Sequence, residues 1–467
     1  MSLKNTHYGA RAIGETLAGV RSLFFIGIGG ISMSSLAEIS LREGYRVGGS
    51  DRNENTQTRH LEELGATVFR GHDALHIDGY DAVIYTVAIG ESNPEYRAAV
   101  ARGIPVISRA DYLGYLMMRF RTRIGVSGMH GKSTCTAMCA HIFLEASDPT
   151  VLCGAELPDL GGSTCRIGAG REHFIFEACE YMDSFLDFYP TVAIILNVDL
   201  DHVDYFENIE HVRRSFLQYA QRTGKDGTVV YNADDRESVL AMEPYEGRRV
   251  TFGIDKPADY EAKNVEIGHD GSQFDLYCKG LFLYHIALPV AGRHCIYDAL
   301  AAAAGALLCG VKAETVAHAL ATFRGAGRRM EYKGKLNGAR VYDDYGHHPV
   351  EIRATLSAAA SMGYRRVLCA YQPHTYSRTA GLWQEFCEAF SAADRVFFAD
   401  IYAAREQNIY GVSSAQLAER IGERASYCDS FRSLAKTITE EAREGDLVII
   451  MGAGDIFKTF DYLELKK

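Results

Sequence analysis

Two glycine-rich segments could wrap a phosphate group. The first, Gly27-Ile28-Gly29-Gly30-Ile31-Ser32, follows the apolar run 23–26 and nearly matches G-x-G-x-x-G, with Ser32 replacing the third glycine. Glycines allow a pyrophosphate to approach the backbone closely, and the N–H groups of a following helix attract it. Asp51 ends the next apolar run and could accept a hydrogen bond from a ribose hydroxyl. Taken alone, this segment also fits a nicotinamide dehydrogenase or a purely structural turn.

The second segment is Gly128-Met129-His130-Gly131-Lys132-Ser133-Thr134, between an expected strand at 123–127 and an expected helix at 133–146. In such a loop the backbone amides cradle phosphates, the lysine contacts the β- and γ-phosphates and the hydroxyl binds Mg²⁺. The spacing departs from that of an ordinary P-loop, because Val126 occupies the position of the first glycine. We predict a nucleoside triphosphate site here.

Short apolar runs alternate with amphipathic stretches, which predicts an α/β fold. At about 150 residues per domain, a chain of 467 residues forms about three domains. The segment 250–291 alternates between apolar and polar residues, so we expect its strands to lie outside the main sheet. The other expected strands are 23–26, 45–51, 67–69, 82–85, 105–107, 123–127, 174–177, 192–197, 339–342, 366–370, 395–399 and 447–451.

The amino-acid composition limits the binding partners and the cellular location that we expect for this protein. The 49 basic and 60 acidic residues give a formal charge of −11, which disfavours nucleic acid as a partner. The apolar segment 299–311 is shorter than the roughly 18–20 residues of a membrane span, so we expect a buried helix and no membrane partner. The first residues lack a secretion signal and the 11 cysteines form no CxxC pair. We therefore expect a cytoplasmic protein with free thiols, as a monomer or weak homodimer.

Nine strings in collinear order, which span nearly the whole chain, resemble the Mur ligase family. They are GIGGIS (27–32), GMHGKST (128–134), FEACEYMDSF (176–185), LNVDLDHVDYF (196–206), GRHCIYDALAA (292–302), FRGAGRRME (323–331), VYDDYGHHPVE (341–351), YQPHTYSRT (371–379) and MGAGDI (451–456). The resemblance implies three domains: a Rossmann-like UDP-sugar domain (1–120), a central P-loop-type ATP-binding domain (121–329) and a Rossmann-like amino-acid-binding domain (330–467). It also replaces the dehydrogenase interpretation, since the first loop of such ligases holds the diphosphate of UDP.

The resemblance further implies ATP-driven amide formation in peptidoglycan precursor synthesis. The lactyl carboxylate of UDP-N-acetylmuramate would take the γ-phosphoryl group of ATP, and the amine of L-alanine would attack the acyl phosphate. Sibling ligases that add later amino acids carry a carbamylated lysine on the helix after the Asp-His pair. Here the stretch 210–222 contains Arg213 and Arg214 but no lysine, which agrees with the alanine-adding branch.

Site roles come from the same resemblance. The implied catalytic residues are Lys132, Glu177, His202 and His348, with Ser133, Glu177 and His202 as Mg²⁺ ligands. The implied ATP contacts are Gly128, Met129, His130, Gly131, Lys132, Ser133, Thr134, His294, Asp298, Arg328 and Asp344, with Arg329 as a second arginine. The UDP-sugar would contact Gly27, Gly29, Gly30, Ile31, Ser32 and Asp51. The amino acid would contact Tyr345, His347, His348, His374 and Arg378.

This chain departs from the family pattern at five positions. Met129 replaces a threonine and Cys179 an aspartate, Cys295 and Asp298 replace asparagines, and Thr375 replaces an arginine. Two other interpretations stay open. One is a recycling ligase that attaches an intact tripeptide to UDP-N-acetylmuramate. The other is a catalytically silent relative that senses UDP-sugar or ATP, which the retention of Lys132, Glu177, His202 and Arg378 disfavours.

Overall fold

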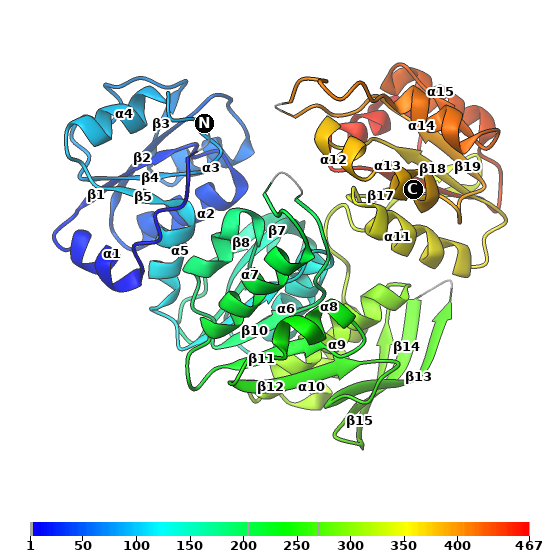
Figure 1. Ribbon diagram of the computed structural model, residues 1–467, viewed down its shortest axis with the longest axis horizontal. Helices are drawn as coiled ribbons and strands as arrows, with labels where there is room; N and C mark the ends of the chain where they lie inside the picture. Colours follow the sequence, from blue (N-terminus) through cyan, green and yellow to red (C-terminus); the bar gives the residue numbers. More distant parts are fainter. Residues whose placement is uncertain (1–2, 203–204, 269–270, 405, 467) are drawn as a thin grey trace.

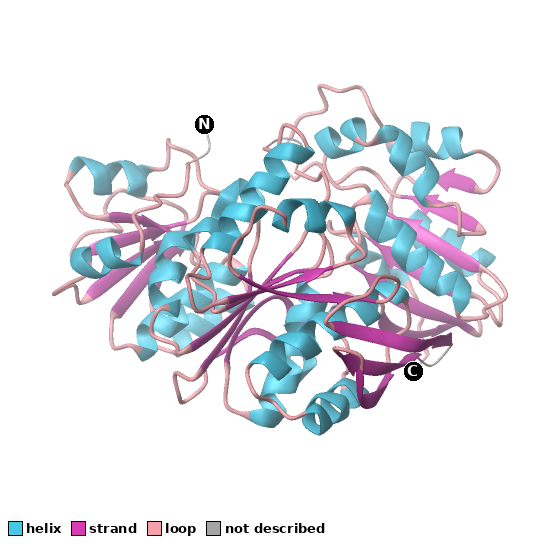
Figure 2. Ribbon diagram, turned by 60° about the horizontal axis from the view of Figure 1, so that its bottom comes forward, coloured by secondary structure: helices cyan, strands magenta, loops and turns pink. Residues whose placement is uncertain are grey.

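The computed structural model describes residues 3–202, 205–268, 271–404 and 406–466. Within these ranges three β-sheets follow one another along the chain, which confirms the α/β fold class. Figure 1 shows the first and third sheets, each with its helices, on the same side of the middle one. Helices cover both faces of the sheets (Figure 2). No helix among the described residues is long and apolar enough to cross a membrane.

The first sheet has the strand order β3-β2-β1-β4-β5, and all its strands are parallel. The order reverses between β1 and β4, and parallel α/β sheets commonly bind ligands outside the carboxyl ends of the strands at such a point. Its strands are β1 (Ser22–Ile26), β2 (Arg46–Asp51), β3 (Thr67–Arg70), β4 (Ala82–Tyr85) and β5 (Val106–Ser108). Its helices are α1 (Ala10–Thr16), α2 (Ile31–Arg42), α3 (Thr56–Glu63), α4 (Pro94–Ala101) and α5 (Arg109–Met117).

The middle sheet has ten strands in the order β15-β14-β13-β12-β11-β10-β6-β9-β7-β8. The strands are β6 (Thr122–Ser127), β7 (Thr150–Leu157), β8 (Ser163–Arg166), β9 (His173–Glu177), β10 (Val192–Ile195), β11 (Thr228–Asn232), β12 (Arg248–Gly253), β13 (Tyr260–Gly268), β14 (Gly271–Cys278) and β15 (Leu281–Leu288). The helices are α6 (Lys132–Ala146), α7 (Ile209–Gln221), α8 (Arg236–Met242), α9 (Arg293–Leu308) and α10 (Ala313–Thr322), with short 3-10 helices η1 (Pro158–Leu160) and η2 (Tyr181–Asp187).

The expectation that the strands of 250–291 lie outside the main sheet is wrong. β12 pairs with β11 over five residues, and β13 then joins β12 through two parallel pairs, Phe252 with Tyr260 and Gly253 with Glu261. β13, β14 and β15 continue the sheet as antiparallel neighbours. Alternation correctly indicated a half-exposed sheet, but it carries no information about which edge the strands join.

The third sheet has the order β16-β17-β21-β18-β19-β20, in which only β16 is antiparallel to its neighbour. The strands are β16 (Glu331–Leu336), β17 (Ala339–Asp344), β18 (Val367–Tyr371), β19 (Arg395–Phe398), β20 (Ala425–Tyr427) and β21 (Leu447–Met451). The helices are α11 (Pro349–Ser361), α12 (Tyr376–Gly381), α13 (Trp383–Ala389), α14 (Ser414–Ile421) and α15 (Phe431–Glu441), with the 3-10 helix η3 (Ile456–Tyr462). β21 is buried along its whole length, as a central parallel strand requires.

Apolar packing joins the first two sheets but separates the third. One cluster runs from Leu36 and Tyr112 of the first unit to Phe174 and Phe216 of the middle unit. The clusters around β18 and β21 of the third unit are built almost entirely from its own residues. The third unit therefore meets the middle one mainly through polar contacts, described below. The 11 cysteines are free thiols, as expected.

The core of the third sheet gives a test of this packing. Ile449 of β21 is fully buried, so Ile449→Ala should lower the free energy of unfolding of this unit by about 2–5 kcal/mol, through lost transfer energy and a residual cavity. Leu281→Ala on β15 is the matched control, because its side chain is 71% exposed and truncation should cost under about 0.5 kcal/mol. Urea unfolding measures both. Equal effects would contradict the assignment of β21 to the core.

Candidate active site

Three loops meet at the carboxyl edge of the middle sheet because β9, β6 and β10 are neighbours there. They are the loop 128–131 after β6, the segment 178–180 after β9 and the segment 196–202 after β10. Asn197 fixes the first loop to the third: its Oδ1 accepts from the backbone N of His130 at 2.9 Å, and its Nδ2 donates to the His130 carbonyl at 3.0 Å. Gly131 adopts the left-handed conformation (φ 83°) before α6, and a Cβ there would lie 2.6 Å from Asp298.

Lys132 is held by carboxylate and carbonyl oxygens at the start of α6. Its Nζ donates to the Gly128 carbonyl at 2.6 Å and lies 3.0 Å from Oε2 of Glu180. Glu180 also lies 3.2 Å from Nε2 of His202, so one buried carboxylate holds two of the predicted catalytic residues. Burial alone would raise the pKa of Glu180, but Lys132 and His202 outweigh burial and keep it below its usual value.

Ser133 and Glu177 form the donor set expected for a hard cation. Ser133 Oγ donates to Oε2 of Glu177 at 2.8 Å, and the backbone N of Gly154 donates to the same oxygen at 3.0 Å. Two oxygens this close match neighbouring positions around an octahedral Mg²⁺, whose metal–oxygen distances of about 2.0–2.1 Å separate adjacent ligands by roughly 2.9 Å. These two residues fit the implied ion, whereas His202 is engaged by Glu180.

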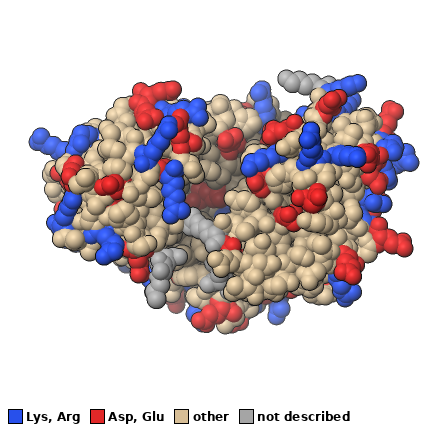
Figure 3. Space-filling model, turned by 90° about the horizontal axis from the view of Figure 1, so that it is seen from above, with Lys and Arg blue, Asp and Glu red and all other residues tan. Residues whose placement is uncertain are grey.

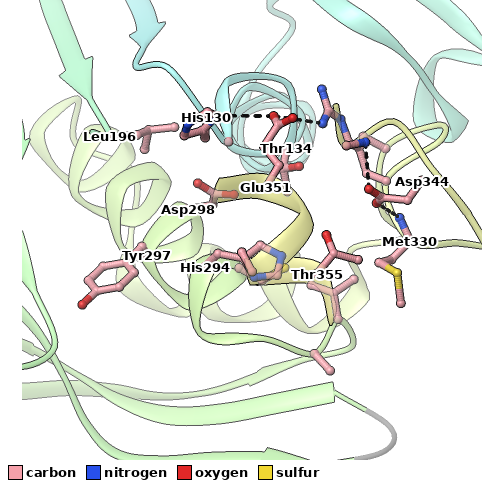
Figure 4. A pocket seen from close by; sticks show the side chains of 18 of the residues that line it. His130, Thr134, Leu196, His294, Tyr297, Asp298, Met330, Asp344, Glu351 and Thr355 are labelled. Carbon is pink, nitrogen blue, oxygen red and sulfur yellow. Dashed lines mark hydrogen bonds and ion pairs between the residues drawn. The ribbon is translucent and has the colours of Figure 1, made fainter. Parts of the chain in front are cut away.

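A cavity of about 650 Å³ opens beside this edge, between the middle and third sheets. Of the predicted nucleotide contacts, six line it: His130, Gly131, Thr134, His294, Asp298 and Asp344. Figure 4 shows five of these residues, His130, Thr134, His294, Asp298 and Asp344, around the cavity, with the helix that carries Glu351 and Thr355 closing one wall.

Two of the three arginines of the FRGAGRRME string, Arg328 and Arg329, point to different places. Arg328 donates to Asp343 at 3.1 Å and to the Gly452 carbonyl at 2.7 Å, and it does not line the cavity. Arg329 does line it, and its Nη1 lies 3.8 Å from Oε1 of Glu351. The geometry thus favours Arg329 over the predicted Arg328 as the cation that faces the cavity.

Burial sets the protonation of the acids and histidines in the wall. It raises the pKa of Asp298 well above its usual value and that of Asp344 to about 6, the latter against the opposing effect of Arg329. It lowers the pKa of His294 to about 4. Burial therefore favours the neutral form of Asp298, in which the carboxyl group has an O–H donor beside its acceptor oxygen.

Glu351 links the third unit to the loop of α6. Its Oε2 accepts from the backbone N of His347 at 2.9 Å, which caps the start of α11, and its Oε1 lies 3.5 Å from Nδ1 of His130. Nε2 of His130 lies 3.8 Å from Asp199, and its ring lies 4.8 Å from that of His348. Burial disfavours the charged ring of His130, but Asp199 and Glu351 prevail and raise its pKa to about 9.

The predicted amino-acid contacts gather at the same junction. Arg378 Nη1 lies 3.2 Å from Nδ1 of His374, whose ring lies 5.9 Å from that of His347. Burial lowers the pKa of His347 to about 3 and of His374 to about 4, so both are neutral at pH 7. The guanidinium groups of Arg328 and Arg329 each lie 5.1 Å from the ring of Tyr345. Thr375 begins α12.

The first glycine loop is built separately, on the first sheet. The backbone N of Gly29 donates to Oδ2 of Asp51 at 3.0 Å, so the two predicted elements are in contact. Ile31 and Ser32 begin α2, after Gly27 (φ 82°) and Gly30. Arg109, the first residue of α5, donates to Ser32 Oγ at 3.0 Å and adds a cation to this loop. Figure 3 shows a hollow in the face above the middle sheet, with Lys and Arg side chains on both sides.

Sequence reasoning left several of these partners without a role, notably Glu180, Asp199, Asp201 and Glu351. All four lie inside strings that the resemblance covers. The signal for Asp199, Asp201 and Glu351 is a carboxylate within three residues of a predicted site histidine, whereas Glu180 lies three residues after Glu177. The contacts that give them a role cross between loops or between sheets, so no sequence spacing reveals them.

The three α/β sheets, and the Gly-Lys-Ser loop between a parallel strand and a helix, define a multi-domain α/β protein with a nucleotide-type loop at its middle sheet. Comparison with protein families identifies it further. Residues 23–121 match the Mur ligase family catalytic domain, 126–306 the Mur ligase middle domain and 328–454 the Mur ligase glutamate ligase domain. The chain belongs to the Mur ligase family.

Relatives match over nearly the full length. The UDP-N-acetylmuramate–L-alanine ligase of Clostridium novyi (strain NT) is 43% identical over 451 residues, which cover 96% of this chain and 98% of that protein. The protein of the same name from Caldanaerobacter subterraneus subsp. tengcongensis is 43% identical over 453 residues, with the same coverage. The crystal structure of UDP-N-acetylmuramate–alanine ligase from Thermotoga maritima superimposes with a TM-score of 0.78 at 27% identity, covering 94% of this chain and 98% of that one.

The contacts of His130 predict a pH dependence. An unfolded histidine has a pKa of about 6.5, and folding raises that of His130 to about 9. Its stabilising contribution is therefore complete below pH 6.5 and is lost as the pH rises through 9. The difference in unfolding free energy between wild type and His130→Gln should fall over this range and then level off.

Urea unfolding at a series of pH values measures that difference. His60→Gln, which removes an exposed histidine of α3, is the matched control and should show a smaller pH effect. A difference independent of pH for His130→Gln would mean that Asp199 and Glu351 do not stabilise the charged ring.

Proposed function

We propose that this protein is an ATP-dependent ligase that joins L-alanine to the lactyl carboxylate of UDP-N-acetylmuramate in peptidoglycan synthesis. The observation that carries the proposal is the full-length identity of 43% to proteins named for this reaction, together with a site that retains Lys132, Ser133, Glu177 and His202.

The chemistry requires two anions to meet. In the first step a lactyl carboxylate oxygen attacks the γ-phosphorus of ATP, so that the acyl phosphate forms and ADP leaves. In the second step the amine of L-alanine attacks the acyl carbon, phosphate leaves and the amine loses a proton. Most of the catalytic work is therefore neutralisation of charge and positioning.

ATP fits the cavity between the middle and third sheets. The start of α6 directs backbone N–H groups toward the phosphates, and Lys132 would exchange its contacts with Glu180 and the loop carbonyls for the β- and γ-phosphates. Asp344 lies in the wall, where a carboxylate can accept from the ribose. Asp298, His294 and Cys295 line the part of the cavity that would hold the base.

Mg²⁺, which ATP-dependent ligases of this family require, would neutralise phosphate charge when bound. Ser133 and Glu177 would hold it, because their oxygens already lie 2.8 Å apart. His202 is a further proposed ligand of the ion. To bind it, Nε2 of His202 would have to release Glu180, which would stay paired with Lys132.

We assign the substrates to three segments. Residues 1–120 would bind the UDP-sugar, through the loop 27–32, Asp51 and Arg109, whose guanidinium supplies a positive charge for the diphosphate. Residues 121–329 would bind ATP. Residues 330–467 would hold L-alanine, with Arg378 suited to pair with its carboxylate through two parallel hydrogen bonds. Since ATP and UDP-sugars are cytoplasmic metabolites, we place the reaction in the cytoplasm.

The recycling ligase stays a weaker alternative. The murein peptide ligase of Psychrobacter arcticus superimposes with a TM-score of 0.69 at 24% identity, which supports the shared fold alone. Three relatives at 43% identity are named for L-alanine. The silent-relative interpretation is disfavoured by the retained Lys132 and Glu177.

Phosphate release is the direct test. Purified protein should release phosphate from ATP only when both UDP-N-acetylmuramate and L-alanine are present. Lys132→Ala should abolish this release, because losing one preorganised cation on the transferred group costs roughly 3 kcal/mol or more. It should still bind UDP-N-acetylmuramate by calorimetry, since that ligand belongs to the first unit. Phosphate release with UDP-N-acetylmuramate and an intact tripeptide, but not with L-alanine, would show that the protein is the recycling ligase instead.

The metal site predicts a second result. Glu177→Gln keeps the shape of the side chain but removes the charged oxygen that lies beside Ser133. The rate should fall, and the Mg²⁺ concentration that gives half-maximal rate should rise. Glu207→Gln, an exposed change beyond the same edge of the sheet, is the control. An unchanged Mg²⁺ titration of Glu177→Gln would show that Glu177 does not bind the ion.

A further inference from the structure

A buried ion pair crosses from the middle unit to the third beside the proposed reacting centre. Arg378 of α12 donates from Nε to Oδ1 of Asp201, in the loop after β10, at 3.2 Å. Their side chains are only 12% and 6% exposed. Moving two charges out of water is costly, and a buried pair is often no more stable than apolar residues would be. Stability alone is therefore a weak reason for the pair.

Both partners are held in place by other groups. Oδ1 of Asp201 also accepts from the backbone N of His202 at 2.6 Å, and His374 lies 3.2 Å from Nη1 of Arg378. The carboxylate of Asp201 therefore lies directly opposite the guanidinium of Arg378.

Within the described part of the chain, the hydrogen bonds of the pair leave one anionic and one cationic atom unused. Among the residues that the structure describes, both hydrogen bonds of Asp201 fall on Oδ1 and none on Oδ2. Arg378 uses Nε and Nη1, and within the same residues Nη2 makes no hydrogen bond. A carboxylate oxygen accepts and a guanidinium nitrogen donates, so one contact offers both kinds of site.

We propose that Asp201 binds the ammonium group of the amino-acid substrate while Arg378 binds its carboxylate. An α-amino acid carries these two opposite charges on one carbon, so it complements the free atoms of the pair. The proposal rests on the proposed function and deepens it, because it places the reacting nitrogen. Before attack, the ammonium group must still release a proton.

The position in the chain supports this orientation. Asp201 directly precedes His202, and consecutive Cα atoms are about 3.8 Å apart, so the ammonium group would lie on the side of the γ-phosphate. Arg378 belongs to the third unit, so the carboxylate would lie on the far side. The amino acid would then bridge the two units through its two charged groups. Selectivity for its side chain would depend only on the space available in the site.

The experiment compares L-alanine with L-lactate, which has a hydroxyl in place of the ammonium group. Four proteins are compared: wild type, Asp201→Asn, Asp201→Glu and Glu207→Gln. For each we measure kcat, the KM for L-alanine, the KM for ATP and the inhibition constant of L-lactate against L-alanine. Losing one charged hydrogen bond should raise the KM for L-alanine about 10- to 100-fold in Asp201→Asn. The inhibition constant of L-lactate should change less than about twofold.

Asp201→Glu, which keeps the charge, should recover part of the preference for L-alanine, and Glu207→Gln should match wild type. If Asp201 only positions Arg378, Asp201→Asn will weaken the binding of L-alanine and of L-lactate equally, and this result would overturn the proposal. An unchanged KM for L-alanine in Asp201→Asn overturns it as well. Circular dichroism and UDP-sugar binding verify that each variant is folded. A wild type that releases no phosphate with L-alanine would instead refute the proposed function.

Discussion

The carboxyl edge of the middle sheet is the constraint on which the site depends. Because β9, β6 and β10 run parallel as neighbours, the segments that follow them must emerge together. These segments carry Lys132, Glu180 and His202, which are 48 and 22 residues apart along the chain yet share one carboxylate. Any change in strand order would separate them, whatever their sequence motifs.

Charge balance follows from this crowding. Several cations are gathered in a buried place, and carboxylates neutralise them: Glu180 beside Lys132, Glu351 beside Arg329 and His130, and Asp201 beside Arg378. A substrate anion can replace a carboxylate partner directly, so the buried cation never has to bear the free-energy cost of being unpaired. The network is therefore arranged for exchange of partners as much as for stability.

The way the units are joined agrees with such exchange. A continuous apolar cluster fixes the first unit to the middle one, whereas the third meets the middle one through ionisable contacts. Contacts between charges depend on pH, salt and ligand, and apolar contacts much less so. The cavity of about 650 Å³ lies at this polar junction.

The sequence by itself determined the α/β class, most strands and the two glycine loops, because alternation, β-branched runs and glycines act over a few residues. It also determined the family, through nine strings in order. It did not determine that β13–β15 extend the middle sheet, that Arg329 and not Arg328 faces the cavity, or that Asp201 pairs with Arg378. Only the tertiary structure decided these, since each depends on contacts between segments whose separation along the chain leaves no local pattern.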